Sequence, residues 1–355
     1  MQSVDIFESE RLDFLDGWRT ISVTLVILAH SLVFSNLANE QTAASIFASF
    51  GDLGVQIFFV LSGYVICRGL LTELASGQGM SLKSFYMRRC VRIVPPLYLY
   101  ISTVLFLKFL TVLPDQSSDL KYGYLFLCNV PVEILSCGGY SGLHLYTLSF
   151  EEQFYLIFPL ALLICSSLRA LPSLSLLCLC LPILASVAVV FEREYLSYYL
   201  FCVSFLAMGV CAALNEARLF ALLSRLKPVH FVITVAIVVV VSARSSVLMG
   251  ESVSKLIMPP LIVVMLFATV RNPFAMRLLT SPCLLLIGRS SYSIYLWQEL
   301  ATRHFEGLAP YWSILFVMLA IVWGVVSFRY LEYPLIQWVK HSLRRTAASS
   351  LEPAV

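Results

Sequence analysis

Apolar segments long enough to cross a lipid bilayer recur along this 355-residue chain, and they constrain its fold more than any other feature. A transmembrane helix needs about 20 consecutive, predominantly apolar residues. The mean hydropathy is +0.85, 59% of the residues are hydrophobic and 13% are charged. A soluble domain of this length could not cover so much apolar surface. The composition therefore predicts an all-α, polytopic membrane protein.

Ten windows are candidates for membrane spans, and their ends are defined to about four residues. The windows lie near residues 15–37, 53–75, 91–113, 147–168, 173–191, 196–215, 228–244, 255–271, 283–303 and 311–338. They predict one transmembrane domain over residues 1–344, followed by a disordered cytoplasmic tail over residues 345–355.

Positive charge is concentrated in alternate loops. The loop near residues 38–50 has no lysine or arginine, whereas the next loop is strongly basic. Because cytoplasmic loops carry an excess of these residues, both termini are predicted to be cytoplasmic, in agreement with an even number of spans. The basic residues of the predicted cytoplasmic side are Arg68, Lys83, Arg88, Arg89, Arg92, Arg169, Arg218, Arg225, Lys227, Arg271, Arg277, Lys340, Arg344 and Arg345.

Two titratable side chains, Arg19 and His30, interrupt the first window. Such groups are costly inside a bilayer and therefore indicate a functional role. At about 1.5 Å of rise per residue, they lie roughly 16 Å apart along a helix. Arg19 is expected near the cytoplasmic boundary and His30 in the outer half of the membrane.

Glu151, near the outer end of the fourth window, is expected at a depth similar to that of His30. A carboxylate beside an imidazole can orient the ring and stabilise the imidazolium that forms when the ring takes a proton. We therefore predict that His30 and Glu151 meet as a catalytic pair. The alternative is that backbone or water satisfies each of them separately.

Arg89 and Arg92 lie at the inner end of the third window, three residues apart, so they share one helix face. Two guanidinium groups on one face can hold phosphate oxygens. Alone, this pair is explained by the positive-inside bias, but Arg19 at a similar depth makes a cytoplasmic anion site plausible. Glu332, late in the last window, is expected to pair with a nearby arginine.

Packing or position at the membrane interface explains several other polar or small residues. Ser62 and Gly63 are interpreted as helix-packing residues, and Tyr155 as packing or interfacial. Gln298 and Glu299 are polar at the predicted outer-half depth and are expected to line the same cavity as His30.

The ten cysteines do not indicate a metal site. Cys178 and Cys180 lack metal-ligand spacing and histidine partners, which argues against zinc. Cys128 and Cys137 fall in a predicted outer loop, where they form either a disulfide in an oxidising compartment or two unpaired thiols.

Five ordered segments of the chain resemble the membrane-bound acyltransferase family 3, which includes O-acetyltransferases of bacterial surface polysaccharides. In this resemblance Glu151, not Glu152, aligns with the family's key acid. Tyr146 replaces a frequent tryptophan, and Gln298 replaces a frequent histidine, so an auxiliary histidine role is not carried over to that position. The five segments are residues 12–30 with the Arg-x10-His spacing, 51–64, 85–95, 145–155 and 287–297.

The resemblance implies an O-acyltransferase of the bacterial inner membrane. Its acyl group, expected to be acetyl, would pass from cytoplasmic acyl-CoA to hydroxyls of a surface or lipid-linked glycan, such as lipopolysaccharide or exopolysaccharide. Arg19, Arg89 and Arg92 would bind acetyl-CoA as a co-substrate, and His30 with Glu151 would activate the acceptor. No permanently bound cofactor or metal and no nucleic-acid partner is expected, whereas membrane lipids surround the chain.

Three other functions remain open from the residues. The same machinery could acylate a small lipophilic acceptor such as a macrolide. A transporter of glycan precursors would often show internal repeat symmetry, and no repeat is visible. A non-catalytic assembly subunit would not require a histidine, a glutamate and three arginines placed in this way.

Overall fold

The computed structural model describes residues 12–33, 41–76, 80–110, 120–130, 137, 142, 144–248, 250–302 and 310–349. Within these ranges the chain forms helices and no strand, as predicted. Helices suit a bilayer because each segment satisfies its own backbone hydrogen bonds. The α-helices are α1 (Asp13–Val33), α2 (Gln41–Ala75), α3 (Leu82–Phe109), α4 (Leu145–Ser167), α5 (Leu171–Val190), α6 (Glu194–Leu214), α7 (Glu216–Leu223), α8 (Pro228–Leu248), α9 (Gly250–Ala268), α10 (Pro273–Leu279), α11 (Pro282–Arg289), α12 (Ser291–Thr302), α13 (Pro310–Ser327) and α14 (Tyr333–Ser349), joined by the short helices η3 (Leu120–Leu125), η4 (Thr269–Arg271) and the π-helical η5 (Phe328–Glu332).

Seven helices of the described part are long and apolar enough to cross a membrane, and the bent pair of α7 and α8 raises that number to eight. Each of the eight overlaps one predicted window. The other two windows correspond to α1, which carries Asp16, Arg19 and His30, and to α11 and α12, which are separated at Ser290. A chain with multiple membrane spans is therefore confirmed, whereas the number ten and the orientation remain predictions.

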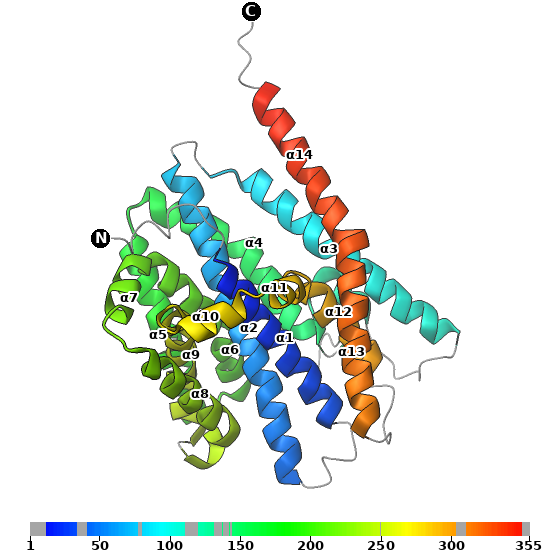
Figure 1. The fold of residues 1–355 in the computed structure, drawn as a ribbon. Helices are drawn as coiled ribbons and strands as arrows, with labels where there is room; N and C mark the ends of the chain where they lie inside the picture. Colours follow the sequence, from blue (N-terminus) through cyan, green and yellow to red (C-terminus); the bar gives the residue numbers. More distant parts are fainter. Residues whose placement is uncertain are drawn as a thin grey trace, which may run out of the picture.

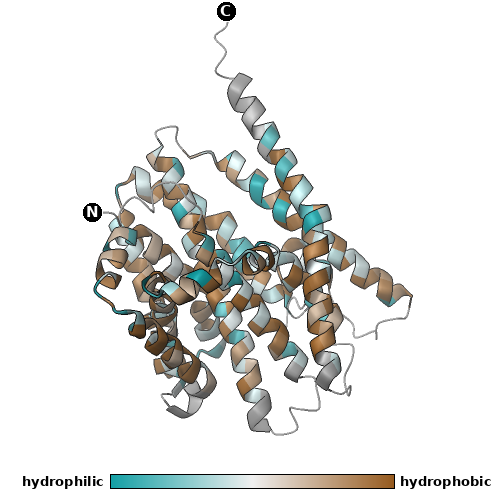
Figure 2. Cartoon of the chain, in the orientation of Figure 1, coloured by the Kyte–Doolittle hydropathy of each residue, from teal (hydrophilic) through white to brown (hydrophobic). Residues whose placement is uncertain are grey.

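α1 and α2 lie at the centre of the bundle, with α6 packed on α2 and with α11 and α12 packed on α1 (Figure 1). α14 extends away from the bundle beside one end of α3. Hydrophobic residues dominate α5, α8 and α13, whereas hydrophilic residues gather along α14 and the adjoining end of α3 (Figure 2). The predicted boundary at residues 344/345 falls inside α14, and residues 350–355 lie outside the described part of the chain.

Two glycines allow α2 and α6 to approach each other closely. A Cβ atom added at Gly63 would overlap the carbonyl oxygen of Leu206, and one added at Gly209 would overlap the carbonyl oxygen of Val60. Small residues at such crossings let two helix backbones touch. The resulting van der Waals packing stabilises helix association in lipid, where the hydrophobic effect does not drive it. The packing interpretation of Gly63 is in agreement with this geometry.

The α2–α6 crossing gives a first test of the fold. Gly63→Ala is expected to destabilise the protein by about 1–3 kcal/mol, because the added methyl group forces the two backbones apart. Gly69→Ala on the same helix is the matched control, since nothing lies within 4 Å of a Cβ atom there. Thermal unfolding of both variants in detergent measures the difference. Equal melting temperatures for the two variants would contradict the close crossing.

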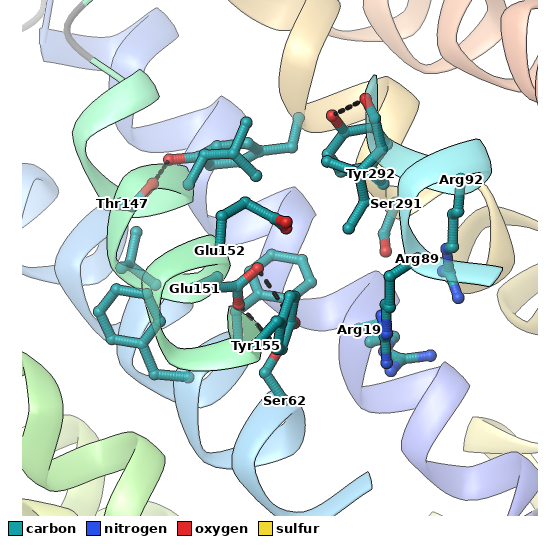
Figure 3. Close-up of a pocket in the computed structure, with 16 residues that line it drawn as sticks. Arg19, Ser62, Arg89, Arg92, Thr147, Glu151, Glu152, Tyr155, Ser291 and Tyr292 are labelled. Carbon is teal, nitrogen blue, oxygen red and sulfur yellow. Dashed lines mark hydrogen bonds between the residues drawn. The ribbon is translucent and has the colours of Figure 1, made fainter. Parts of the chain in front are cut away.

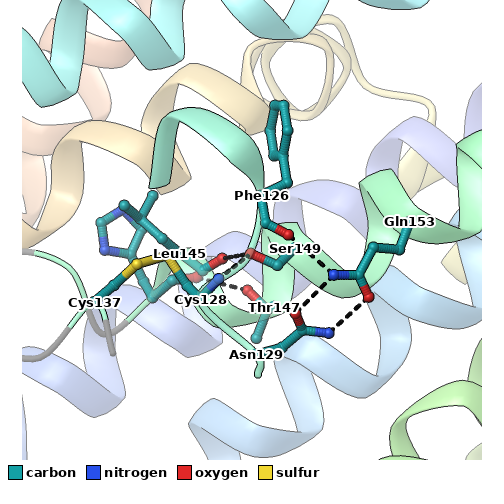
Figure 4. Close-up of a disulfide and its surroundings, with 9 residues drawn as sticks. Phe126, Cys128, Asn129, Cys137, Leu145, Thr147, Ser149 and Gln153 are labelled. Carbon is teal, nitrogen blue, oxygen red and sulfur yellow. Dashed lines mark hydrogen bonds between the residues drawn. A yellow bond between two sulfur atoms is a disulfide. The ribbon is translucent and has the colours of Figure 1, made fainter. Parts of the chain in front are cut away.

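The segment before α4 is closed on itself by a disulfide and is tied to that helix by a set of hydrogen bonds (Figure 4). Cys128 and Cys137 form the disulfide, which resolves the alternative that the sequence left open. The Cys128 backbone N–H donates to Ser149 Oγ at 3.1 Å, and the side-chain amides of Asn129 and Gln153 exchange hydrogen bonds of 2.9 and 2.8 Å. These contacts hold residues 126–129 against the half of α4 that carries Glu151 and Glu152.

Candidate active site

A cavity open to solvent lies between α1, α2, α3, α4 and α12, with about 670 Å³ of empty space when the part open to solvent is included. Four of the five predicted site residues line it: Arg19, Arg89, Arg92 and Glu151. The rest of the lining is mainly aromatic rings and hydroxyl groups. These residues are Val55, Phe58, Phe59, Ser62, Ile93, Thr147, Leu148, Glu152, Tyr155, Ser291, Tyr292 and Tyr295.

Three guanidinium groups gather on one side of the cavity (Figure 3). Arg19 Nη1 lies 3.0 Å from Asp16 Oδ1, which orients it from the preceding turn of α1. Arg89 stacks on the ring of Tyr155, with 4.6 Å between the guanidinium carbon and the ring centroid. Arg92 is close enough to Arg19 and Arg89 for mutual repulsion.

This gathering has the chemistry of an anion site. In the part of the chain that the structure describes, neither Arg89 nor Arg92 has a carboxylate within salt-bridge distance. Glu332 is fully buried, accepts a hydrogen bond from Ser293 and acts on Arg92 electrostatically from beyond that distance. Guanidinium groups bind phosphate through bidentate hydrogen bonds, so a bound phosphate would relieve the repulsion among the three.

Two carboxylates face the guanidinium groups from α4. Glu151 Oε1 accepts a hydrogen bond of 2.7 Å from Ser62, and its Oε2 accepts a weaker one of 3.5 Å from Tyr155. Glu152 Oε1 is buried and has no hydrogen-bond partner among the described residues. Ser62 and Tyr155 thus have roles beyond packing, because they hold Glu151 in the cavity wall.

His30 lies outside this lining, towards the far end of α1. Its Nδ1 is 3.1 Å from Gln298 Oε1 and 3.3 Å from Glu299 Oε1, both on α12. The neighbour that the structure shows at Nδ1 is therefore Glu299, in place of Glu151. Gln298 and Glu299 were expected from their depth to line one cavity together with His30. They do not line the cavity with the arginines and are fully buried against His30.

Similar membrane depth led to the prediction that His30 meets Glu151, but depth does not specify which turn of α4 lies beside His30. His144, Thr147, Glu151 and Tyr155 are spaced so that they follow one face of the helix. His144 Nδ1 lies 3.9 Å from Glu299 Oε1, so the residue at the start of α4 reaches the His30 level. Glu151 lies seven residues further on, about 10 Å along the helix axis.

Tyr295 connects the cavity to the His30 cluster. Its hydroxyl lies 2.5 Å from Thr147 Oγ1 and donates to the carbonyl oxygen of His144 at 3.2 Å. Tyr295 lines the cavity, and its ring also packs edge-on against that of His144. His144 was not among the predicted site residues, although its spacing from Thr147 and Glu151 places the three on one helix face.

The family model for the acyltransferase domain, Acyl_transf_3, matches residues 12–329, which run from the start of α1 into η5. The matched range includes every predicted site residue. No solved structure gives a significant match.

Three curated proteins are similar in sequence. Peptidoglycan O-acetyltransferase OatA of Listeria monocytogenes is 28% identical over 355 positions, covering 90% of this chain and 55% of that protein. Putative peptidoglycan O-acetyltransferase YrhL of Bacillus subtilis is 36% identical over 188 positions, covering 49% and 28% respectively. O-acetyltransferase OatA of Staphylococcus aureus is 30% identical over 166 positions, covering 44% and 26%. The aligned regions span about half of the first relative and about a quarter of the other two.

Proposed function

We propose that this chain, which belongs to the acyltransferase family Acyl_transf_3, is a membrane O-acetyltransferase that uses cytoplasmic acetyl-CoA and acetylates hydroxyls of a cell-envelope glycan. One observation carries the proposal. A cavity with three guanidinium groups on one wall reaches Tyr295, and Tyr295 in turn contacts the cluster of His30, His144 and Glu299. Tyr295 therefore connects the proposed anion site to the proposed catalytic imidazole.

In this proposal Arg19, Arg89 and Arg92 bind the phosphate groups of acetyl-CoA. The flexible arm of the donor then runs along the α4 face, past Glu151 and Thr147, towards Tyr295. Glu151 contacts the donor on this route. Before the donor binds, the carboxylates of Glu151 and Glu152 offset part of the positive charge of the three arginines, which makes the empty cavity less costly in a membrane.

His30 is proposed as the general base. Both neighbours of its Nδ1 are hydrogen-bond acceptors, so Nδ1 carries the hydrogen and Nε2 carries the lone pair. Nε2 takes the proton of the acceptor hydroxyl while that oxygen bonds to the thioester carbonyl carbon. The carbon–sulfur bond then breaks, and the imidazolium returns its proton to the CoA thiolate. A transient acetyl-His30 intermediate is a variant of the same chemistry.

The two substrates can approach from opposite sides. The His30 side chain is 25% exposed, whereas its partner Glu299 is fully buried. The disulfide between Cys128 and Cys137 supports placing the loop before α4 in an oxidising compartment outside the plasma membrane. We therefore place the acceptor on that side and the donor site on the cytoplasmic side of a bacterial inner membrane.

The acceptor class is drawn from the relatives. Two of them are named for peptidoglycan, which favours peptidoglycan over the lipopolysaccharide or exopolysaccharide expected from the sequence. No observation in the structure favours a macrolide acceptor or a transporter. Peptidoglycan is accordingly the proposed acceptor.

A labelling experiment tests the function. Membranes and cell walls from cells that express this chain are incubated with acetyl-labelled acetyl-CoA, and cells without it serve as the control. The expected result is label in peptidoglycan that mild alkali releases as acetate, because O-acetyl esters are alkali-labile. Label on a small lipophilic molecule would change the acceptor class. Movement of a glycan precursor across the membrane without label in any acceptor would replace the enzyme with a transporter.

A further inference from the structure

We infer that Glu299 is the positioning residue that orients His30 and stabilises its protonated form during acetyl transfer. The inference rests on the proposed function of His30 as general base. The expected partner of His30 was Glu151 on α4, whereas the geometry assigns this role to a carboxylate on α12. Glu299 does not act on the substrate directly but through the imidazole of His30.

Glu299 lies between two imidazoles. Its Oε1 is 3.3 Å from Nδ1 of His30 on α1 and 3.9 Å from Nδ1 of His144, which precedes α4. Three segments far apart in the sequence thus meet at one carboxylate oxygen. These distances place Glu299 where it can stabilise positive charge on His30 when that ring is protonated.

The burial of Glu299 makes a purely structural role costly. The side chain is 0% exposed, and its helix neighbours Leu296 and Trp297 belong to an apolar core. A buried carboxylate pays a large desolvation penalty, and well-packed apolar residues often replace a buried ion pair without loss of stability. A glutamate at this position therefore points to a requirement of the chemistry.

The surroundings keep the carboxylate in place. The ring of His144 is 1% exposed and packs edge-on against Tyr100 and Tyr295, with ring centroids 5.4 and 5.5 Å away. The aromatic contacts limit the movement of His144, and His144 in turn limits that of Glu299. His30 is the partly exposed member of the cluster, and its Nδ1 is held from the buried side.

Gln298 and Glu299 contribute differently to the orientation of His30. Both side chains present an oxygen to the same Nδ1, at 3.1 and 3.3 Å. The neutral amide of Gln298 helps to fix the tautomer, but only the carboxylate of Glu299 strongly stabilises the imidazolium. Removing the charge is therefore expected to lower kcat by about 10²-fold, towards the lower end of the effect of losing a general base, because Gln298 still orients the ring.

Glu299→Gln tests the charge and Glu299→Asp tests its rescue. For Glu299→Gln we expect the loss in kcat with an unchanged KM for acetyl-CoA and unchanged donor binding, since the arginine site is intact. Glu299→Asp keeps the charge and should recover part of kcat. The matched control is Glu216→Gln, which removes a carboxylate that binds Arg68 outside the cavity lining and should leave kcat unchanged. Wild-type kcat in Glu299→Gln would overturn the inference.

A second measurement stays informative if Glu299→Gln fails to fold. The chain has five histidines, so ¹⁵N-histidine NMR of the wild-type protein gives few signals, and the signal missing in His30→Ala identifies His30. We expect His30 to be protonated at Nδ1 when neutral. A neutral His30 protonated at Nε2 would overturn the inference, because Nδ1 would then present a lone pair to the Glu299 carboxylate 3.3 Å away.

The experiments distinguish a wrong role for Glu299 from a wrong proposed function. If Glu299→Gln is fully active and His30→Ala is inactive, the role of Glu299 is wrong and the proposed function stands. If the wild-type protein transfers no acetyl group to any acceptor, the proposed function is wrong. The NMR result still decides in that case whether Nδ1 of His30 carries a hydrogen on the side that faces the buried carboxylate.

Discussion

His30→Ala is expected to lower the rate of acetyl transfer by about 10²–10⁴-fold, the usual effect of losing a general base. The imidazole is the proposed proton acceptor, and no described residue presents another imidazole at the exposed side of this cluster, since His144 is buried. Acetyl-CoA binding should be unchanged, because His30 does not line the cavity with the arginines. Single-turnover transfer from labelled acetyl-CoA measures the rate, and a titration of the purified protein measures binding.

The control for this prediction is His230→Ala. His230 is exposed at the start of α8, where its Nδ1 accepts a hydrogen bond of 3.0 Å from the backbone N–H of Lys227. His30→Gln is a useful second variant, because its amide can still donate to Glu299 but does not act as a base. Folded, inserted His30→Ala protein with near-wild-type transfer would remove His30 from the mechanism.

The double variant Arg89→Ala/Arg92→Ala is expected to raise the Kd for acetyl-CoA by about 10²-fold or more. Hydrogen bonds to charged groups contribute about 1.5–3 kcal/mol each, and 1.4 kcal/mol corresponds to a tenfold change in Kd. Arg89→Lys/Arg92→Lys should recover only part of the affinity, because an ammonium group lacks the bidentate geometry of a guanidinium. Isothermal titration with acetyl-CoA measures each Kd.

Arg88→Ala is the matched control for the double variant. Arg88 lies on the same helix, but it is exposed and pairs with Glu73 at 2.5 Å. Its loss should leave the Kd unchanged, which separates a specific donor site from a general effect of positive charge near the membrane surface. Unchanged acetyl-CoA binding in the folded double variant would contradict the assignment of the donor site.

The convergence of the arginines was predictable from local features of the sequence. Arg89 and Arg92 share a face because they are three residues apart on a helix, and Arg19 was placed at the same inner depth by the direction of its span. Charged groups in apolar segments must face the interior of the bundle, so their meeting in one cavity follows from the cost of exposing them to lipid. Glu151 reached the same cavity for the same reason.

The partner of His30 was not predictable in this way. Depth along a helix says how far a side chain lies from the membrane boundary, but not which neighbouring helix it faces. His30 contacts Glu299 because α12 packs on α1, and the neighbourhood of α1, α2 and α6 depends on close contacts such as that of Gly63 with Leu206. Ser62 and Tyr155 gained their roles as partners of Glu151 through the same packing.

By itself the sequence determined that this chain is a helical membrane protein, that its positive charge is asymmetric along the spans, and that Arg19, Arg89, Arg92 and Glu151 are polar groups within apolar windows, which are expected to face the interior of the bundle. These properties follow from hydropathy and helical spacing, which are local. Only the tertiary structure decided that Glu299 and His144 surround His30, and that Tyr295 lies between this cluster and the arginine cavity. Those contacts depend on how each helix is rotated and packed against helices distant in the chain, and no local pattern encodes that rotation.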